Sequence, residues 1–239
     1  MNGRCIAMWS GPRNISTAMM RAWENRSDTV VLDEPFYAHF LDRTGIEHPM
    51  RDDIVAEGET DWAKIVSRLI EKPASGLFYQ KHITTHWLEH FKTDWLTELS
   101  HVFLIRDPEP VAASYAVKRH SVTASDLGYS QQSELFRIIT KMQGKKPPVI
   151  DSKRFLENPK SQLETLCDIL EIPFEDTMLT WPTGARESDG IWGAHWYDAV
   201  NQSTGFKPPQ AKQAELTDAQ QDIANECKAY YEELRDVAI

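Results

Sequence analysis

The feature that most constrains the fold is a short apolar run that ends at a polar residue and a turn, and it recurs along the chain. CIAMW, TVVLD, HVFLI and PPVID follow this pattern, and longer helical segments separate them. Such alternation is typical of a parallel sheet covered by helices. We therefore predict a three-layer α/β/α fold with a central, mainly parallel sheet, whose strands lie at 4–9, 29–33, 76–81, 101–105 and 148–151.

Helical periodicity fills the intervals between these runs. In TDWAKIVSRLIEK, five apolar residues recur at the spacing of one helix face, for which core packing is the default role. We expect helices at 15–25, 61–71, 108–118, 131–142, 160–170 and 218–234. Residues 178–210 lack periodicity but contain the aromatic cluster WGAHWY, which favours a lid or binding loop within a single domain that spans 1–239.

Composition narrows the class of partner. A formal charge of −10 argues against a non-specific nucleic-acid or membrane-surface binder, because phosphate-rich partners would be repelled over most of the surface. No stretch approaches transmembrane length, and nothing resembles a signal peptide. The three cysteines are widely spaced without a CxxC pair, which is typical of reduced thiols and not of zinc ligands. We therefore expect a cytoplasmic protein, and the sequence leaves its oligomeric state open.

The first predicted strand feeds a loop that suits an anion. A loop that enters a helix N-terminus presents free backbone N–H groups and the positive end of the helix dipole, which together bind phosphate or sulfate. In RNIST, Asn14 can cap the helix and Arg13 adds a positive charge. We assign this anion site to Gly11, Pro12, Arg13, Asn14, Ile15, Ser16 and Thr17.

The ATP-binding loop GxxxxGK[ST] does not fit this segment. Counted from Gly11, the second glycine position holds Ser16 and the lysine position holds Thr17. The alternative interpretation of the segment is an ordinary strand–loop–helix turn with a surface arginine.

A second anion site is predicted in HVFLIRDPEPVAASYAVKRH. The strand ends at Arg106, Asp107 is a plausible N-cap, and two prolines fall in the first helical turn, where a missing N–H costs little. Ser114 lies eight residues after Arg106. One arginine at the strand edge and one hydroxyl on the helix can therefore converge on a single anion.

Three segments together resemble the sulfotransferases that use 3′-phosphoadenosine 5′-phosphosulfate (PAPS). Strand–Arg–Asp–Pro with Ser114 resembles their 3′-phosphate segment, RNIST is similar to their 5′-phosphosulfate loop, and VIDSKRFLENPKSQLETLCDILEIPFE resembles a further family segment. The resemblance covers roughly residues 4–176 and implies a P-loop-like nucleoside-phosphate-binding fold, with PAPS as co-substrate and no metal. Arg13 stands where the family more often has lysine, and Ile15 where it often has glycine. Arg186, in the late loop, is carried over as a further cofactor contact.

Sulfuryl transfer needs a group that takes the acceptor's proton. Glu34, in DEPFYAHF after the second strand, resembles the catalytic glutamate of carbohydrate-type sulfotransferases, and repulsion from Asp33 would raise its pKa. His82 and His86, in YQKHITTHW after the third strand, are rival bases by resemblance to the hormone-type enzymes. Lys81 in the same segment is a candidate for stabilising charge. We favour Glu34 as the base.

The predicted function is sulfuryl transfer from PAPS to a hydroxyl or amine of a small-molecule acceptor, with 3′,5′-phosphoadenosine (PAP) as leaving group. Arg13 would assist as the bridging bond breaks. Trp192, Trp196 and Tyr197 either cover the adenine or the acceptor, or pack in the core. Two alternatives stay open: a P-loop kinase-like nucleoside-phosphate enzyme, and a catalytically idle nucleotide-binding member of the same fold.

Overall fold

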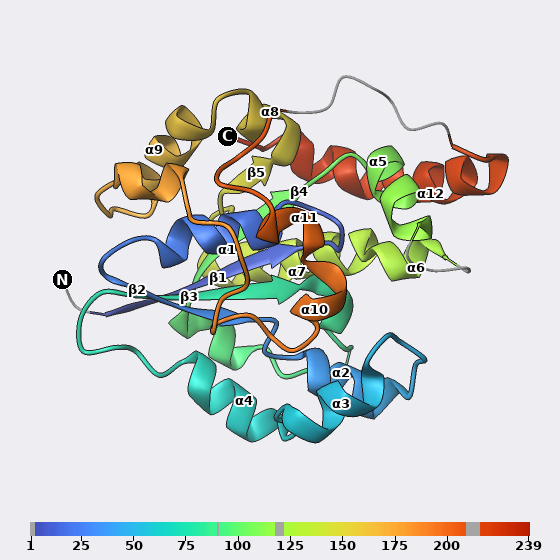
Figure 1. Cartoon of the computed structure of the whole chain (residues 1–239), viewed down its shortest axis with the longest axis horizontal. Helices are drawn as coiled ribbons and strands as arrows, with labels where there is room; N and C mark the ends of the chain where they lie inside the picture. The colour runs from blue at the N-terminus through green and yellow to red at the C-terminus, as the bar shows by residue number, and fades with distance from the viewer. Residues whose placement is uncertain (1–2, 90, 118–121, 209–215) are drawn as a thin grey trace.

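The computed structural model describes residues 3–89, 91–117, 122–208 and 216–239. Five parallel strands form one sheet in the order β2-β3-β1-β4-β5 (Figure 1). Their bounds are β1 Arg4–Ser10, β2 Thr29–Asp33, β3 Leu77–Ile83, β4 Ser100–Ile105 and β5 Val149–Asp151. The parallel α/β sheet predicted from the sequence is confirmed, and the predicted strand ends differ from these by no more than two residues.

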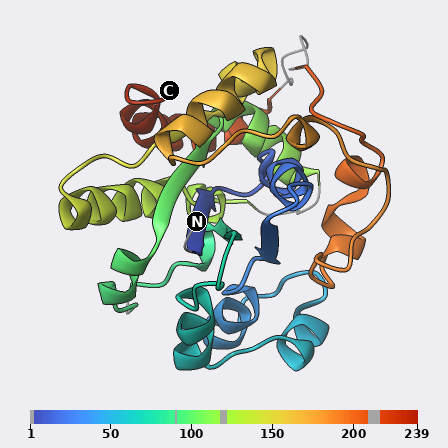
Figure 2. The same cartoon turned by 90° about the vertical axis from the view of Figure 1, so that its left-hand side faces the viewer.

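Helices connect the strands and cover both faces of the sheet (Figures 1 and 2). The longer helices are α1 Ser16–Glu24, α2 Tyr37–Thr44, α3 Arg51–Glu57, α4 Trp62–Leu69, α5 Pro108–Ala116, α7 Tyr129–Gln143, α9 Pro159–Ile169 and α12 Asp218–Arg235. The shorter elements are η1 Thr84–His86, η2 Asp94–Glu98, α6 Ala124–Leu127, α8 Ser152–Glu157, η3 Asp176–Leu179, α10 Gly193–Trp196 and α11 Asp198–Asn201. None of the helices in the described ranges is both long and apolar enough to cross a membrane.

Side chains of the central strand β1 alternate between two hydrophobic cores. Ile6 and Met8 pack in the core beneath α1 and α9, whereas Ala7 and Trp9 pack in the core beneath α7 and α12. Successive side chains of a strand point to opposite faces, so a strand buried on both faces reads as a continuous apolar run. CIAMW is such a run, and the two cores give the fold its three layers.

Local capping signals explain where several helices begin. Asp61 accepts hydrogen bonds from the first-turn N–H groups of α4, and Thr217 and Gln220 form a capping box at α12. Asp107 caps α5, which carries a proline in its first turn, as the sequence predicts. The expected end of this helix at 118 and the last two residues of the 178–210 segment lie outside the described residues.

The aromatic-rich segment after η3 is fastened to the body of the fold. Arg21 of α1 makes two hydrogen bonds to the Asp189 carboxylate, at 2.6 and 2.7 Å, and the Arg21 side chain is 1% exposed. Thr180 and Gly205 form a bridge that closes the segment on itself. Its short helices α10 and α11 are thereby held beside the carboxyl ends of the strands (Figure 1).

Candidate functional site

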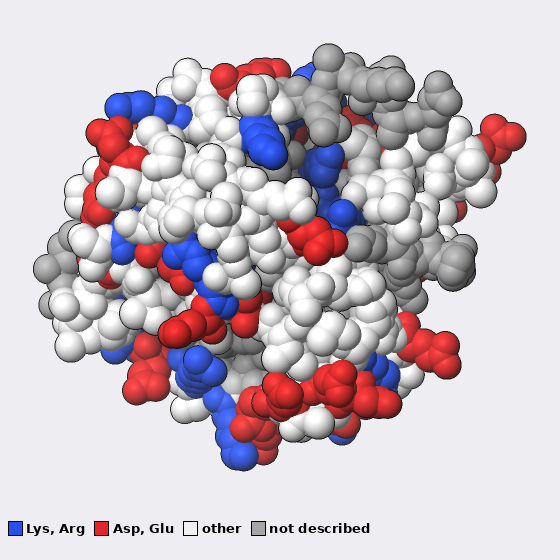
Figure 3. Space-filling model, in the orientation of Figure 1, with Lys and Arg blue, Asp and Glu red and all other residues white. Residues whose placement is uncertain are grey.

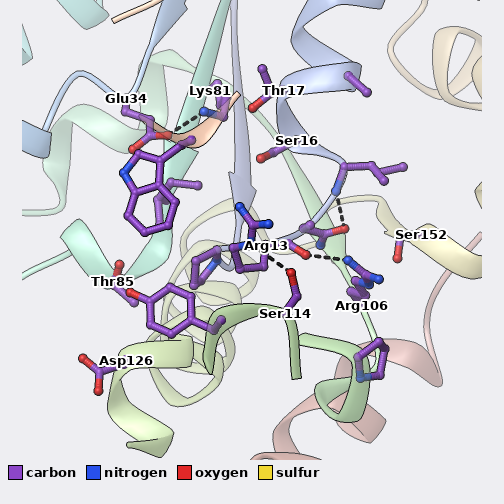
Figure 4. A pocket seen from close by; sticks show the side chains of 18 of the residues that line it. Arg13, Ser16, Thr17, Glu34, Lys81, Thr85, Arg106, Ser114, Asp126 and Ser152 are labelled. Carbon is purple, nitrogen blue, oxygen red and sulfur yellow. Dashed lines mark hydrogen bonds and ion pairs between the residues drawn. The ribbon is translucent and has the colours of Figure 1, made fainter. Parts of the chain in front are cut away.

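The carboxyl ends of the strands open into one cleft of about 1770 Å³. The cleft extends from Glu34 and Lys81, past the loop after β1, to Arg106 and Ser152 (Figure 4). Parallel α/β sheets bind their ligands on this side. Pockets that hold one drug-sized ligand measure roughly 300–1,000 Å³, so the cleft has room for two small molecules. In the part of the chain that the structure describes, no group of three or more His, Cys, Asp or Glu residues could hold a metal ion.

The loop between β1 and α1 is braced by Asn14. Its Nδ2 donates to the Leu104 carbonyl at 3.1 Å, and its Oδ1 accepts from the Ile15 N–H at 2.8 Å. Asn14 therefore does not cap α1 as predicted, and α1 begins after Ile15 with no side-chain cap. The first turn, at Ser16 and Thr17, lines the cleft. Uncapped N–H groups at a helix N-terminus form a ready anion site.

Gly11 supports this loop from behind. A Cβ at this position would lie 3.1 Å from the Leu127 carbonyl, so glycine allows the loop to pack closely against the end of α6. Pro12 and the loop residues that follow line the cleft, whereas Gly11 does not. The position of Gly11 thus supports a packing role and not the direct cofactor contact predicted from the sequence.

Two arginines, one in the loop after β1 and one directly after β4, meet at this loop. Arg13 Nε donates to Ser114 Oγ at 3.0 Å, and Arg106 donates to the Arg13 carbonyl at 2.6 Å (Figure 4). The Tyr129 hydroxyl donates to the Arg106 carbonyl at 2.7 Å, which fixes the end of β4. The structure therefore brings together three residues that the sequence analysis assigned to two separate anion sites.

Neither arginine is paired directly with a carboxylate. Within the described residues, no carboxylate forms an ion pair with Arg13 or Arg106, although Asp198 and Asp107 attract them from farther away, and burial lowers the pKa of both guanidinium groups. Lys153 and Lys207 line the same part of the cleft. Figure 3 shows Lys and Arg side chains gathered in a hollow between α11 and α5, although the protein carries a net charge of −10. Partly buried cations that lack a directly paired carboxylate favour an anionic ligand.

At the other end of the cleft, a buried acidic pair shares one lysine. Lys81 Nζ donates to Asp33 Oδ1 at 2.8 Å, to Glu34 Oε1 at 2.5 Å and to the Tyr197 hydroxyl at 2.6 Å. The Lys81 side chain is 1% exposed, so these partners use all three of its protons. Lys81 thus holds the acidic pair, and its geometry does not support the expected role of stabilising charge on the moving group.

Glu34 presents its second oxygen to the cleft. Glu34 Oε2 has no hydrogen-bond partner among the described residues and lies 4.0 Å from His86 Nδ1. That nitrogen is also buried without a partner, and the His86 ring stacks on Tyr37 and Phe40. Burial raises the pKa of Glu34 and lowers the pKa of His86 well below its usual value. A neutral imidazole and a carboxylate oxygen, each with unused hydrogen-bonding capacity, define a place for a polar ligand atom.

Arg13 and Glu34 share an uncommon backbone conformation. Their φ angles are 54° and 36°, in the left-handed region that favours glycine. The Glu34 N–H donates to the Lys81 carbonyl at 2.9 Å, and Arg106 holds the Arg13 carbonyl. Strained residues of this kind concentrate at functional sites when the surrounding structure holds them in place.

A family model described as a sulfotransferase domain matches residues 4–238 of the chain. The chain belongs to the sulfotransferase domain family. Solved structures share its fold at low sequence identity. A sulfotransferase from Alicyclobacillus acidocaldarius gives a TM-score of 0.59 at 9% identity, over 100% of this chain and 98% of that one. A mouse sulfotransferase complexed with PAP gives 0.53 at 11% identity, over 99% and 90% of the two chains. The sulfotransferase-type fold predicted from the sequence is confirmed.

Two curated relatives from Arabidopsis thaliana are more similar in sequence. The domain is 34% identical to branched-chain-amino-acid aminotransferase-like protein 2, over 96% of this chain and 41% of that protein. It is 36% identical to branched-chain-amino-acid aminotransferase-like protein 1, over 86% of this chain and 37% of that protein. The sulfotransferase domain therefore spans about two fifths of the length of these relatives.

Besides Gly11, two predicted site residues lie outside the cleft of the sulfotransferase domain. His82 is 1% exposed and stacks on Trp9 with 4.1 Å between ring centroids, on the face of β3 opposite Lys81. Burial lowers the pKa of His82 to about 3. Arg186 pairs with Glu24 at 3.6 Å and does not line the cleft. Neither position supports the base role or the cofactor contact that the sequence analysis assigned.

The aromatic cluster divides between the two ends of the site. The Trp196 ring lines the cleft with its centroid 5.9 Å from the Arg13 guanidinium, consistent with the predicted covering role. Tyr197 is buried, and its hydroxyl contacts Asp33 and Glu34 at 2.7 and 3.2 Å, a position that the sequence analysis did not foresee. Trp192 Nε1 donates to the Tyr197 hydroxyl at 3.0 Å.

The sequence analysis also missed Arg21, which holds the late segment to α1. The sequence MMRAW indicates that this arginine is buried, because a single charged residue interrupts an apolar stretch there. Charged side chains are almost never fully buried unless they are paired. A buried carboxylate partner, here Asp189, was therefore to be expected.

Proposed function

We propose that the domain is a PAPS-dependent sulfotransferase, which moves a sulfuryl group from PAPS to a hydroxyl or amine of a small-molecule acceptor. One observation carries this proposal. Among the described residues, the cleft has two arginines without an ion-paired carboxylate and an uncapped helix at one end, and an oxygen of Glu34 without a hydrogen-bond partner at the other. Membership in the sulfotransferase domain family and the fold shared with a PAP complex support it.

The donor end of the cleft fits a nucleotide with two separate anionic groups. The uncapped first turn of α1 and Arg13 would hold the 5′-phosphosulfate, and Arg106 with Ser114 would hold the 3′-phosphate. Because Arg13 Nε already donates to Ser114 Oγ, the two anion sites adjoin. Bound there, PAPS supplies an activated sulfuryl group.

The acceptor end offers a place for the reacting oxygen or nitrogen. Glu34 Oε2 and His86 Nδ1 are 4.0 Å apart. A ligand atom that is hydrogen-bonded to both at about 2.8 Å would form an angle of about 90° with them, which a hydroxyl or amine can adopt. Glu34 Oε2 takes the acceptor proton as the new bond to sulfur forms. The bond from sulfur to the bridging oxygen breaks, and PAP leaves with that electron pair, next to Arg13.

Burial of Glu34 suits it to this role. A general base works best when its pKa lies near the operating pH, and burial raises the pKa of Glu34 in that direction. The lysine that it shares with Asp33 limits this rise and keeps a carboxylate available.

Ligand binding and group transfer test the proposal in sequence. Calorimetric titration should show PAP binding without metal and in preference to ATP with magnesium. Arg106→Ala should weaken PAP binding, and Arg68→Ala, which removes an exposed arginine from α4, should not. Transfer is then measured from ³⁵S-labelled PAPS to 2-naphthol, 1-pentanol and tyramine as probes. A preference for ATP with magnesium would favour a kinase-like enzyme, and PAP binding without transfer would favour an idle member of the family.

A further inference from the structure

Tyr197 connects the aromatic-rich segment to the acidic pair. It lies between α10 and α11, is 5% exposed, and its hydroxyl accepts from Lys81 Nζ at 2.6 Å and from Trp192 Nε1 at 3.0 Å. The same hydroxyl lies 2.7 Å from Asp33 Oδ2 and 3.2 Å from Glu34 Oε1. Lys81 and Trp192 occupy the two lone pairs of this hydroxyl, so its single proton is shared between Asp33 Oδ2, the nearer acceptor, and Glu34 Oε1.

These contacts fix which carboxylate oxygen faces the cleft. Both oxygens of Asp33 are engaged: Oδ1 accepts from Lys81, and Oδ2 accepts from the Gly190 N–H at 3.1 Å and from the shared proton of Tyr197. Glu34 Oε1 is held between Lys81 and Tyr197. Rotation of the Glu34 carboxylate would break these contacts, so Oε2 stays directed at His86 and the cleft.

We propose that Tyr197 is a positioning residue for sulfuryl transfer, whose hydroxyl fixes the orientation and the ionisation of Glu34. The inference rests on the proposed function, because it assigns to Glu34 the part of the base. The Tyr197 hydroxyl is occupied by protein groups, so Tyr197 acts through the carboxylate.

The surroundings of Glu34 give the direction of the effect on its ionisation. The titratable groups that face it are Asp33 of β2, Lys81 of β3, His86 of η1 and Tyr197. Burial and Asp33 raise the pKa of Glu34, whereas Lys81 and the hydrogen bond from Tyr197 lower it. Removal of the Tyr197 hydroxyl therefore moves the pKa of Glu34 further up.

The test is Tyr197→Phe, which keeps the ring and removes only the hydroxyl. The pH profile of kcat, measured with PAPS and whichever of the three probes reacts fastest, should have its acidic limb moved up by roughly 0.5–1 pH unit. The plateau value of kcat should fall by roughly 5- to 50-fold, because a freed carboxylate spends less time aimed at the acceptor. KM for PAPS should stay within about twofold, since the donor end is untouched.

Tyr231→Phe is the matched control. Tyr231 is also a buried tyrosine whose hydroxyl donates to a carboxylate, Asp151 at 2.8 Å, but it lies on α12 away from Glu34. The pH profile of kcat of Tyr231→Phe should have the same acidic limb as that of the unsubstituted protein. An unmoved limb in Tyr197→Phe, or an equal movement in both variants, would overturn the proposal.

A measurement without turnover separates this inference from the proposed function. Carbon-13 NMR of glutamate-labelled protein follows the Glu34 carboxyl, which is identified by the resonance that disappears in Glu34→Gln. The titration midpoint of the Glu34 carboxyl should rise in Tyr197→Phe and should stay unchanged in Tyr231→Phe. If no probe accepts a sulfuryl group, the proposed function fails while this titration still decides whether Tyr197 controls Glu34.

Discussion

Comparison of alanine with glycine at position 13 tests whether the loop between β1 and α1 stores backbone strain. With φ at 54°, Arg13 occupies the left-handed region, which costs a residue with a Cβ about 1–2 kcal/mol. Both substitutions remove the same side-chain contacts, with Ser114 and with Trp196, so their difference isolates the backbone. Glycine lacks the strain but gains about 0.5–1 kcal/mol more freedom in the unfolded chain. Arg13→Gly should therefore be more stable than Arg13→Ala by roughly 0.5–1 kcal/mol.

Thermal unfolding of the ligand-free protein measures this difference. For a chain of this size, 1 kcal/mol corresponds to a Tm change of about 2–4 °C, so Arg13→Gly should melt about 1–4 °C above Arg13→Ala. A matched pair at Lys228, exposed within α12, should show the opposite sign, because glycine in a helix interior is about 1 kcal/mol worse than alanine.

Equal melting temperatures at position 13, or a more stable alanine variant, would refute the strain argument. Titration with PAP adds a second comparison. The guanidinium is lost in both variants, so both should bind PAP equally weakly. A loss confined to one of them would show that the loop backbone, and not the Arg13 charge, dominates the contact.

Three further predictions follow from the site. Arg106→Ala should weaken PAP binding by about 1.5–3 kcal/mol and Ser114→Ala by about 1 kcal/mol, with little effect on an analogue that lacks the 3′-phosphate; calorimetry with both ligands checks this. Only ionised Glu34 accepts a proton and burial raises its pKa, so kcat should rise with pH through a midpoint above the usual glutamate value of 4.5. Glu34→Gln should lower kcat by roughly 10²–10⁴ and abolish this limb, and His82→Asn should keep it. Asp189→Ala should lower the free energy of unfolding by about 3 kcal/mol in denaturant titrations, because its arginine partner on α1 stays buried with only Glu24, at 3.9 Å, as counter-charge.

The strands and most long helices could be predicted because their signals are local. A strand buried on both faces is a short apolar run, and α4, α5 and α12 begin at side chains that cap them. α2 and α3 were not predicted, since they are short and have no side-chain cap. At α3 the N-cap residue is Met50 with φ at 62°, which offers no sequence signal for a helix start.

The site was predictable in part, for topological reasons. Residues that directly follow parallel strands meet at one edge of the sheet, which is why Arg13, Glu34 and Arg106 could be found. The side of β3 that meets the cleft could not be predicted, because both faces of that strand are buried, and His82 points into the core. Tyr197 reaches the site from a segment without periodicity, so no pattern predicted its contact with the acidic pair.

The contacts that hold the late aromatic-rich segment over the acidic pair join residues that are far apart in the sequence. Asp33 and its partner Tyr197 are separated by 164 positions, and Arg21 and its partner Asp189 are separated by 168. A growing chain therefore exposes Asp33, Glu34 and Lys81 long before the residues that close over them are made, and burial of these charges has to await the last third of translation. A message truncated before Tyr197 encodes all five strands of the sheet but leaves Glu34, the proposed base, without the hydroxyl that contacts it.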